Sequence, residues 1–289
     1  MRTRFAPSPT GPLHLGHAFA AIRAHDMARA AGGDFLLRIE DIDRARARPE
    51  WEDQIYDDLA WLGLAWETPV LRQSDRDTAY DAALDQLWRG RLLYPCHCNR
   101  RDIAAASAAP NEGEPLTGPD GLIYPGTCRG RLAGHDEDLP RPTDCHLRLD
   151  AAAAMATGID RPGFDETGDG EGILRGRVEF TPESFIASVG DIILSRRDMG
   201  TSYHLSVVVD DAAQGITHVT RGADLFVATQ IHVVLQRLLG LPTPVYHHHR
   251  LIRDDTGKRL AKRDDARAIR SYRSAGASPQ DIRRMIGLA

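Results

Sequence analysis

Short apolar runs alternate along this chain with longer segments whose apolar residues recur at helical spacing. Thr3-Arg4-Phe5-Ala6 is short enough for an opening strand, and the alanine-rich residues 18–31 predict a helix. Residues 34–39 form an apolar run after two glycines, which is typical of a buried parallel strand. This order predicts an α/β protein with a parallel sheet.

Further helices are predicted wherever the apolar residues keep helical spacing. Residues 50–62 and 80–89 are amphipathic, with Ser74 or Asp75 as the expected cap of the second helix. Residues 228–239 predict an apolar helix that ends at a glycine. After residue 271 a short helical stretch remains.

Four apolar runs predict strands in the second half of the chain. Residues 189–194 are expected to lead back into the main sheet. The β-branched run at 203–211 predicts a buried central strand, and 215–224 predicts a second strand with a charged end. Residues 245–252 contain three adjacent histidines, which face alternate sides of a strand and so are not expected to share one metal ion.

The stretch from Tyr94 to about Phe180 has a different, irregular composition. It holds a Pro/Gly-rich part at 110–130 and a Gly/Asp-rich part at 158–172, with few long periodic segments. We therefore expect a small inserted domain of short strands and loops between two parts of the α/β protein.

Composition places the chain among cytoplasmic globular proteins. No apolar run approaches the roughly 20 residues that span a bilayer, so no membrane association is expected, and the N-terminus lacks a basic-then-apolar signal segment. The net charge of −5 argues against indiscriminate binding of polyanions, although it permits a local basic face. Four cysteines are too few and too clustered for a disulfide framework, so metal binding is favoured.

The segment from Pro7 to His17 stands between the first predicted strand and the first predicted helix. A helix start favours a bound anion, and Gly11 and Gly16 let a nucleotide approach the backbone. His14 and His17 are one helical turn apart, so both imidazoles can reach phosphate oxygens. The alternative is a Pro/Gly-rich loop followed by a helix with two surface histidines.

The two lysines of the chain, Lys258 and Lys262, lie in one short loop, whereas the other basic residues are arginines. A lysine is a compact, mobile charge suited to phosphate. The alternative is chance combined with a bias toward arginine.

Three charged or polar residues are candidates for an amino-acid site. Glu40 ends the strand at 34–39, where ligands of α/β sheets bind, and its carboxylate suits a substrate ammonium. Tyr203 and Arg221 converge on a carboxylate if both face the crevice. The alternatives are a solvated acidic turn for the first residue, and a core-edge tyrosine and a surface arginine for the other two.

A cysteine pattern in the inserted region predicts a zinc site. Cys96-x-Cys98 and Tyr124-x-x-x-Cys128 supply three thiols and a phenol, and thiolates are good zinc ligands. On chemistry alone the other candidates for a fourth ligand are His97, His135, Cys145 and His146. Free structural cysteines are the alternative.

The string from Phe5 to His17 closely resembles the HIGH-motif region of class I aminoacyl-tRNA synthetases of the glutamyl type. The segments around Glu40, Tyr203 and Arg221 are similar to the glutamyl-synthetase core, and residues 259–263 resemble the KMSKS loop, with Lys262 at its phosphate-binding lysine. The resemblance implies His14, His17 and Lys262 as catalytic residues. The ATP contacts that it implies come from Pro9, Gly11, His14, Gly16, His17, Lys258 and Lys262. The glutamate contacts that it implies come from Arg4, Ala6, Ser8, Glu40, Tyr203 and Arg221.

Three positions depart from the pattern of the family. Val207 and Leu225 stand where glutamyl-tRNA synthetases have Asn and Trp, and Ala261 replaces the usual Ser of the loop. The amino-acid pocket is therefore not expected to be a copy of theirs, and Ala261 lacks the hydroxyl with which that serine forms a hydrogen bond.

The arrangement Cys-x-Cys…Tyr-x-x-x-Cys resembles the zinc site of glutamyl-queuosine tRNA(Asp) synthetases, which selects Tyr124 as fourth ligand, leaves out Cys145 and makes the zinc structural. This resemblance implies a class I catalytic core without an anticodon-binding domain. Its parts are two Rossmann-like halves at 1–93 and 189–256, an acceptor-binding-like zinc insertion at 94–188, and a KMSKS-like loop with a helical tail at 257–289.

The implied reaction uses ATP and Mg²⁺ to activate L-glutamate as glutamyl-adenylate. The glutamyl group then passes to the queuosine base in the anticodon of tRNA(Asp), and a monomer is expected. The alternatives are a truncated glutamyl-tRNA synthetase that charges a tRNA 3′ end, and a non-catalytic synthetase-like RNA-binding module.

Overall fold

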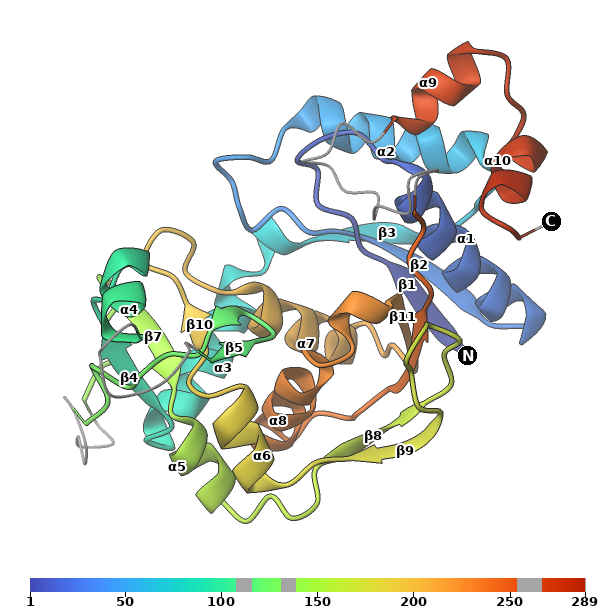
Figure 1. Ribbon diagram of the computed structural model, residues 1–289. Coiled ribbons are helices and arrows are strands. Elements are labelled where there is room, and N and C mark those ends of the chain that lie inside the picture. Colours follow the sequence, from blue (N-terminus) through green and yellow to red (C-terminus); the bar gives the residue numbers. More distant parts are fainter. Residues whose placement is uncertain (108–115, 131–138, 254–266, 289) are drawn as a thin grey trace.

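The first half of the chain forms a parallel sheet covered by helices (Figure 1). The computed structural model describes residues 1–107, 116–130, 139–253 and 267–288. The strand order is β1-β2-β3, and Arg2 of β1 is in register with Asp34 of β2. The strands and their connecting helices are β1 (Arg2–Phe5), α1 (Leu15–Ala30), β2 (Asp34–Ile39), α2 (Pro49–Trp61) and β3 (Glu67–Arg72). The strands and helices expected in this part of the sequence are confirmed.

The second half forms a four-stranded sheet that lies beside β1. The backbone N–H of Thr217, just before β11, donates to the carbonyl oxygen of Arg2 at 3.0 Å, which sets β11 beside β1. The order from there is β11-β12-β8-β9, with β9 antiparallel to β8. The strands are β11 (His218–Gly222), β12 (Val245–His249), β8 (Gly163–Glu166) and β9 (Gly176–Glu179). The two halves therefore meet at β1 and β11, where a ligand crevice is expected in such sheets.

The predicted central strand at 203–211 is wrong, because these residues form helix α7 (Tyr203–Ala213). The side chain of Ser202 caps the helix by accepting from the backbone N–H of Leu205 at 3.4 Å. Leu205 and Val208 are buried at helical spacing beside α8 (Thr229–Leu239). Tertiary packing here overrides the β preference of the valines. Helix α8 ends, as predicted, at Gly240, whose φ of 68° suits glycine.

A second, antiparallel sheet lies at the other end of the molecule (Figure 1). Its order is β10-β7-β4, so the segment predicted at 189–194 contributes only β10 and joins this sheet and not the main one. The elements of this region are β4 (Leu93–Cys96), α4 (Arg100–Ser107), β5 (Thr117–Gly118), β6 (Gly121–Leu122), β7 (His146–Leu149), α5 (Ala151–Ala156), α6 (Pro182–Ser188) and β10 (Ile193–Ser195). The region is more helical than predicted.

The remaining helices connect or close the sheets. The expected cap of α3 (Asp77–Arg89) is wrong, because Ser74 and Asp75 lie in the turn η1 (Gln73–Asp75) and Arg76 precedes the helix without a side-chain cap. The tail forms two helices, α9 (Ile269–Ser274) and α10 (Pro279–Met285), and a further turn, η2 (Ala223–Leu225), follows β11. Arg283 of α10 binds Asp26 of α1 at 2.7 Å, so both ends of the chain pack together. Among the described residues, no helix is long and apolar enough to cross a bilayer.

Candidate active site

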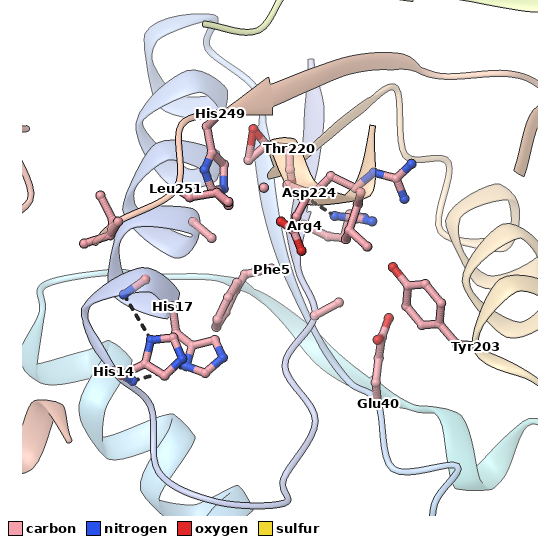
Figure 2. Close-up of a pocket in the computed structure, with 17 residues that line it drawn as sticks. Arg4, Phe5, His14, His17, Glu40, Tyr203, Thr220, Asp224, His249 and Leu251 are labelled. Atoms are coloured by element: carbon pink, nitrogen blue, oxygen red, sulfur yellow. Dashed lines mark hydrogen bonds between the residues drawn. The ribbon is translucent and has the colours of Figure 1, made fainter. Parts of the chain in front are cut away.

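A cavity of about 360 Å³ opens where β1 and β11 end. Residues from both halves of the chain line it, which agrees with the crevice expected at the point where the strand order reverses. Figure 2 shows Glu40 and Tyr203 at one end of the cavity and His14 and His17 at the other. The site residues predicted from the sequence that line it are Arg4, Ala6, His14, Gly16, His17, Glu40, Tyr203 and Arg221.

The two histidines cap helix α1 together. The ring Nδ1 of His14 accepts from the backbone N–H of Gly16 at 3.1 Å, and the ring Nδ1 of His17 accepts from the backbone N–H of His14 at 3.1 Å. Since Nδ1 accepts in both rings, a neutral ring carries its proton on Nε2. The rings stack at 3.8 Å between centroids, and the first turn contains no acidic residue. This helix start is therefore suited to an anion.

Gly16 leaves room for the His14 ring in this cap. A Cβ atom at this position would lie 3.0 Å from Cε1 and 3.1 Å from Nδ1 of the His14 ring. A larger residue would displace the imidazole from its bond to the backbone.

Other parts of the predicted motif act at a distance from the cavity. Pro9 is buried, and its carbonyl oxygen accepts from the backbone N–H of Arg48 at 3.0 Å; neither Pro9 nor Gly11 lines the cavity. Ser8 does not line the cavity either, but its hydroxyl donates to the carbonyl oxygen of Glu40 at 2.6 Å. Ser8 thus holds the strand end that carries the glutamate.

Two buried arginines and one aspartate support the Glu40 end of the cavity. Asp211 of α7 accepts from Nε of Arg4 at 3.0 Å and from Nη1 of Arg38 at 2.7 Å. Arg38 also pairs with Glu40 at 3.1 Å. Burial raises the pKa of Glu40, and Arg38 and Arg4 oppose that rise only in part. Burial also raises the pKa of the Tyr203 phenol, which therefore stays protonated.

Arg38 and Asp211 were not among the predicted site residues. A signal was present, because an arginine inside the apolar run 34–39 needs a buried partner of opposite charge. The sequence did not say which carboxylate supplies it. The predicted strand at 203–211 would have alternated its side chains and hidden the helical spacing that turns Asp211 toward β1 and β2.

Arg221 is held at the same cavity by neutral groups. It donates to His248, His232 and Thr229 at 3.1, 2.9 and 2.6 Å. No carboxylate of the described residues binds it directly. Burial, followed by the charge of Arg221, holds the pKa of His232 well below its usual range, so this ring stays neutral. The site therefore presents a buried, permanently charged guanidinium to the cavity.

The three histidines of β12 alternate as predicted. His247 accepts from Arg23 of α1 at 3.3 Å, His248 contacts Arg221, and the His249 ring lies 4.9 Å from Phe19 of α1. Only His249 lines the cavity. Its Nδ1 bonds the carbonyl oxygen of Arg250 at 2.9 Å, and burial lowers its pKa to about 4. A neutral ring with Nδ1 protonated leaves Nε2 as an acceptor, a role that the sequence reasoning missed.

The lysine loop, with Lys258, Ala261 and Lys262, lies outside the described residues, as does His135. The described chain on both sides of the loop reaches the cavity. Leu251 and Ile252 line it, and Ala268 forms an antiparallel bridge with His14. Of the positions that depart from the family pattern, Leu225 lines the cavity and Val207 is buried in α7.

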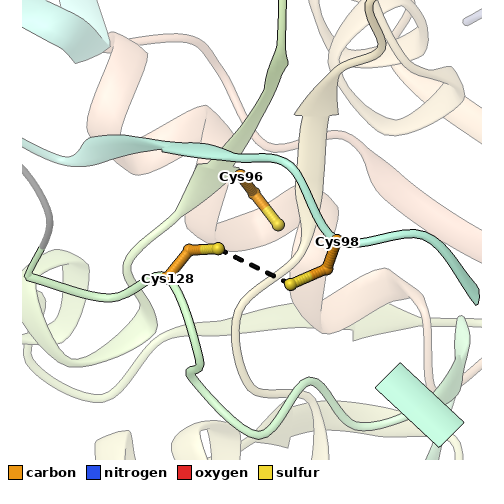
Figure 3. Close-up of side chains that lie close together, drawn as sticks. All are labelled: Cys96, Cys98 and Cys128. Atoms are coloured by element: carbon orange, nitrogen blue, oxygen red, sulfur yellow. Dashed lines mark hydrogen bonds between the residues drawn. The ribbon is translucent and has the colours of Figure 1, made fainter. Parts of the chain in front are cut away.

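Three thiols gather in the small sheet region, as Figure 3 shows. The sulfur atoms of Cys96, Cys98 and Cys128 all lie within 4.8 Å of one another. The phenol of Tyr124 lies 3.4 Å from the Cys98 sulfur and 3.5 Å from the Cys96 sulfur. Tetrahedral zinc with bonds of about 2.3 Å holds its sulfur ligands about 3.8 Å apart, so this donor set fits zinc. Cys145 is buried outside this group.

Burial and internal hydrogen bonds set the protonation of the cluster. Burial would raise the pKa of the Cys128 thiol, but hydrogen bonding, first with Tyr124, outweighs it and lowers that pKa to about 7. Burial and the neighbouring thiols raise the pKa of Tyr124. Without a metal ion this phenol therefore stays protonated.

The comparisons with known proteins agree with this geometry. The model of the class I tRNA synthetase catalytic domain for E and Q matches residues 1–115 and 164–289. The glutamyl-Q tRNA(Asp) synthetase of Rhodobacter capsulatus is 65% identical over 294 residues, covering all of both chains. The enzyme of that name from Nocardia farcinica is 41% identical over 280 residues, which cover 96% of this chain and 81% of the relative.

Solved structures show the same fold. The crystal structure of a glutamate-tRNA synthetase from Elizabethkingia anophelis superposes with a TM-score of 0.68 at 26% identity, over 91% of this chain and 53% of that one. This chain thus spans about half of that synthetase. The methionyl-tRNA synthetase of Mycobacterium tuberculosis, at 12% identity and a TM-score of 0.57, shares the fold alone. The chain therefore belongs to the catalytic-domain family of class I tRNA synthetases for glutamate and glutamine and, within it, to the glutamyl-Q tRNA(Asp) synthetases.

Proposed function

We propose that the protein uses ATP to activate L-glutamate as glutamyl-adenylate and then transfers the glutamyl group to the queuosine base in the anticodon of tRNA(Asp). The observation that carries the first step is one cavity with two chemically distinct ends. One end has the capping imidazoles of His14 and His17, and the other has Glu40 and Tyr203. The guanidinium of Arg221 also lines the cavity, and its charge acts on Tyr203. The second step is supported by the similarity of the chain to the glutamyl-Q tRNA(Asp) synthetases.

The amino-acid end suits glutamate better than glutamine. Glu40 faces the cavity as a partner for the α-ammonium group, and Tyr203 lies opposite it. Arg221 has only donors to offer, and no carboxylate of the described residues is bonded to it. A side-chain carboxylate supplies two acceptors and a negative charge, whereas an amide supplies one acceptor and no charge.

At the other end, the α-carboxylate of glutamate attacks the α-phosphorus of ATP and the bond to pyrophosphate breaks. Negative charge on the phosphate oxygens meets the Nε2–H groups of His14 and His17 and the start of α1. His249 offers an acceptor to the adenine amino group. Mg²⁺ is expected to enter with ATP. Lys258 and Lys262 would supply the charge of the lysine loop.

The cysteine cluster is proposed as a structural zinc site with Cys96, Cys98, Cys128 and Tyr124 as ligands. It would hold the segment around residues 121–130 in shape and take no part in the reaction. We also propose two catalytic halves separated by an insertion, with a tail at 257–289, in a cytoplasmic monomer that receives the anticodon arm. The boundaries expected for the insertion, 94–188, have to change, because β8 and β9 join the main sheet and β10 joins the small one.

Two assays test the proposal in sequence. Glutamate-dependent exchange between ATP and pyrophosphate reports the first step, and its absence would favour a non-catalytic RNA-binding module. Transfer of labelled glutamate to tRNA(Asp) with and without queuosine reports the second step. We expect labelling only of the queuosine-containing tRNA. Equal labelling of both would mean that a tRNA 3′ end accepts the glutamyl group.

A further inference from the structure

The guanidinium of Arg221 is immobilised before any substrate binds. Three of its five N–H groups are used, by His248, His232 and Thr229. One N–H then remains on each terminal nitrogen, which is the number that a carboxylate accepts in a bidentate pair. The groups that hold Arg221 thus decide where a substrate carboxylate can bind.

His232 begins a chain of hydrogen bonds that leads away from Arg221, and the arginine determines the donor direction along it. An arginine has no acceptor, so Nδ1 of His232 must accept from Arg221 at 2.9 Å. The proton of this neutral ring then lies on Nε2, which donates to Nδ1 of His204 at 3.0 Å. Nε2 of His204 in turn donates to a carboxylate oxygen of Asp120 at 2.8 Å. One tautomer of each ring satisfies the whole chain.

A second chain leaves Arg221 on its other side. Nε of the arginine donates to Nε2 of His248, so Nδ1 of this ring carries the proton and donates to Glu166. Glu166 also accepts from the backbone N–H groups of Gly168 and His248, at 2.6 and 2.9 Å. Each chain therefore ends on a carboxylate, which favours the donor direction that Arg221 imposes.

The two chains differ in their surroundings. The side chains of His248 and Glu166 are both 0% exposed, whereas the side chain of Asp120 is 49% exposed. Asp120 lies in the turn between β5 and β6, and the same segment continues to Tyr124 and Cys128 of the thiol cluster. The first chain thus connects an arginine of the main sheet with a surface turn of the inserted region.

We propose that Asp120, His204 and His232 are positioning residues for Arg221, so that the β5–β6 turn contributes to the affinity for the amino-acid substrate. The proposal rests on the proposed function, in which Arg221 receives a carboxylate of glutamate. His232 locates one terminal nitrogen of the guanidinium, His204 accepts from Nε2–H of His232, and Asp120 accepts from Nε2–H of His204. Loss of the aspartate removes the carboxylate acceptor at the end of this chain, which weakens the preference of both rings for the tautomer that accepts from Arg221.

Steady-state kinetics of ATP–pyrophosphate exchange test the proposal through Asp120, which is accessible enough to be replaced without opening the core. For Asp120→Ala we expect a rise of roughly fivefold to tenfold in the KM for glutamate, the usual effect of losing one such hydrogen bond. The kcat and the KM for ATP should stay within about twofold of the wild-type values. The melting temperature should not change beyond experimental error. Asp120→Asn keeps an acceptor for His204 and should recover most of the affinity.

Asp169→Ala is the matched control. Asp169 faces His247, the neighbouring histidine of β12, at 4.0 Å and binds Arg23 at 3.0 Å, but it is not connected to Arg221. Its replacement should leave the KM for glutamate unchanged. An equal effect of Asp120→Ala and Asp169→Ala, or an equal change in the KM values for glutamate and ATP, would overturn the proposal.

A spectroscopic test needs no activity. In protein labelled with ¹⁵N-histidine, long-range ¹H–¹⁵N correlation should show the Nε2–H tautomer for His204 and His232 and the Nδ1–H tautomer for His248. Any other tautomer at His204 or His232 overturns the proposal. If the wild-type protein shows no glutamate-dependent exchange, the proposed function fails while this test still decides the positioning role. If exchange is normal but Asp120→Ala has no effect, only the positioning role fails.

Discussion

Replacing Glu40 by glutamine tests the amino-acid end of the cavity by removing one charge at nearly constant shape. Glu40 follows β2, pairs with Arg38 at 3.1 Å and faces the cavity opposite Tyr203 (Figure 2). The glutamine oxygen can still accept from Arg38. That arginine also keeps Asp211 at 2.7 Å and Gln214 at 3.0 Å, so Glu40→Gln should fold normally.

The expected loss follows from the bond that the ammonium group of glutamate would make. A hydrogen bond to a charged partner contributes about 1.5–3 kcal/mol, which corresponds to roughly 10- to 150-fold in affinity. The lost negative charge also strengthens the attraction of Arg4 and Arg38 for the substrate carboxylates. We therefore expect the KM for glutamate to rise by roughly 10- to 30-fold, near the lower end of that range.

The assay compares glutamate with glutarate, which has the two carboxylates but no ammonium group. In ATP–pyrophosphate exchange, Glu40→Gln should raise the KM for glutamate while the inhibition constant of glutarate stays constant or falls. Glu67→Gln is the control, because Glu67 also pairs with an arginine, Arg29 at 3.8 Å, but lies on the exposed β3. If Glu40→Gln weakened glutarate and glutamate equally, the assignment of the ammonium group to Glu40 would be refuted.

The pH dependence of glutamate binding provides a second test with the same variant. Burial raises the pKa of Glu40, so the carboxylate that we propose as the partner of the ammonium group forms at a higher pH than for an ordinary glutamate. The affinity of the wild-type protein for glutamate should therefore improve as the pH rises through this raised pKa. In Glu40→Gln this improvement should be absent, and its persistence would assign it to another group.

Three further changes test other parts of the structure. Gly16→Ala places a Cβ 3.0 Å from the His14 ring and should lower kcat by roughly tenfold to a hundredfold, measured by exchange, with little change in the melting temperature. Burial raises the pKa of Asp58 to about 6, so this carboxyl stabilises the folded state below its unfolded pKa and loses that contribution as the pH rises through about 6. Urea unfolding at several pH values measures this effect, with Asp58→Asn as the reference. The free energy of unfolding of the wild-type protein, relative to that variant, should fall by about 1 kcal/mol from about pH 5 to about pH 7.5. Cys128→Ser should lose bound zinc, measured by mass spectrometry of the metal, and melt roughly 5 °C lower or more, whereas an unchanged zinc content would contradict the ligand set.

Local patterns in the sequence determined the elements whose residues act on their immediate neighbours. The Pro/Gly-rich stretch between β1 and α1 placed His14 and His17 at a helix start because the spacing of two capping side chains is a property of one turn. The alternation of His247, His248 and His249 follows from the geometry of a single strand. Within Cys96-x-Cys98 and within Tyr124-x-x-x-Cys128 the spacing keeps the side chains close, but only the folded chain brings the two segments together.

Tertiary structure decided where contacts between distant segments outweigh local preference. The valines of 203–211 favour a strand, yet burial against α8 and the cap at Ser202 make the segment helix α7. That choice turns Asp211 toward Arg4 and Arg38, two guanidiniums whose burial requires a carboxylate that no spacing could identify. The bonds from Arg221 through two histidines to Asp120 have the same origin. Each joins residues far apart in the chain, so it exists only once the sheet and the inserted region have packed together.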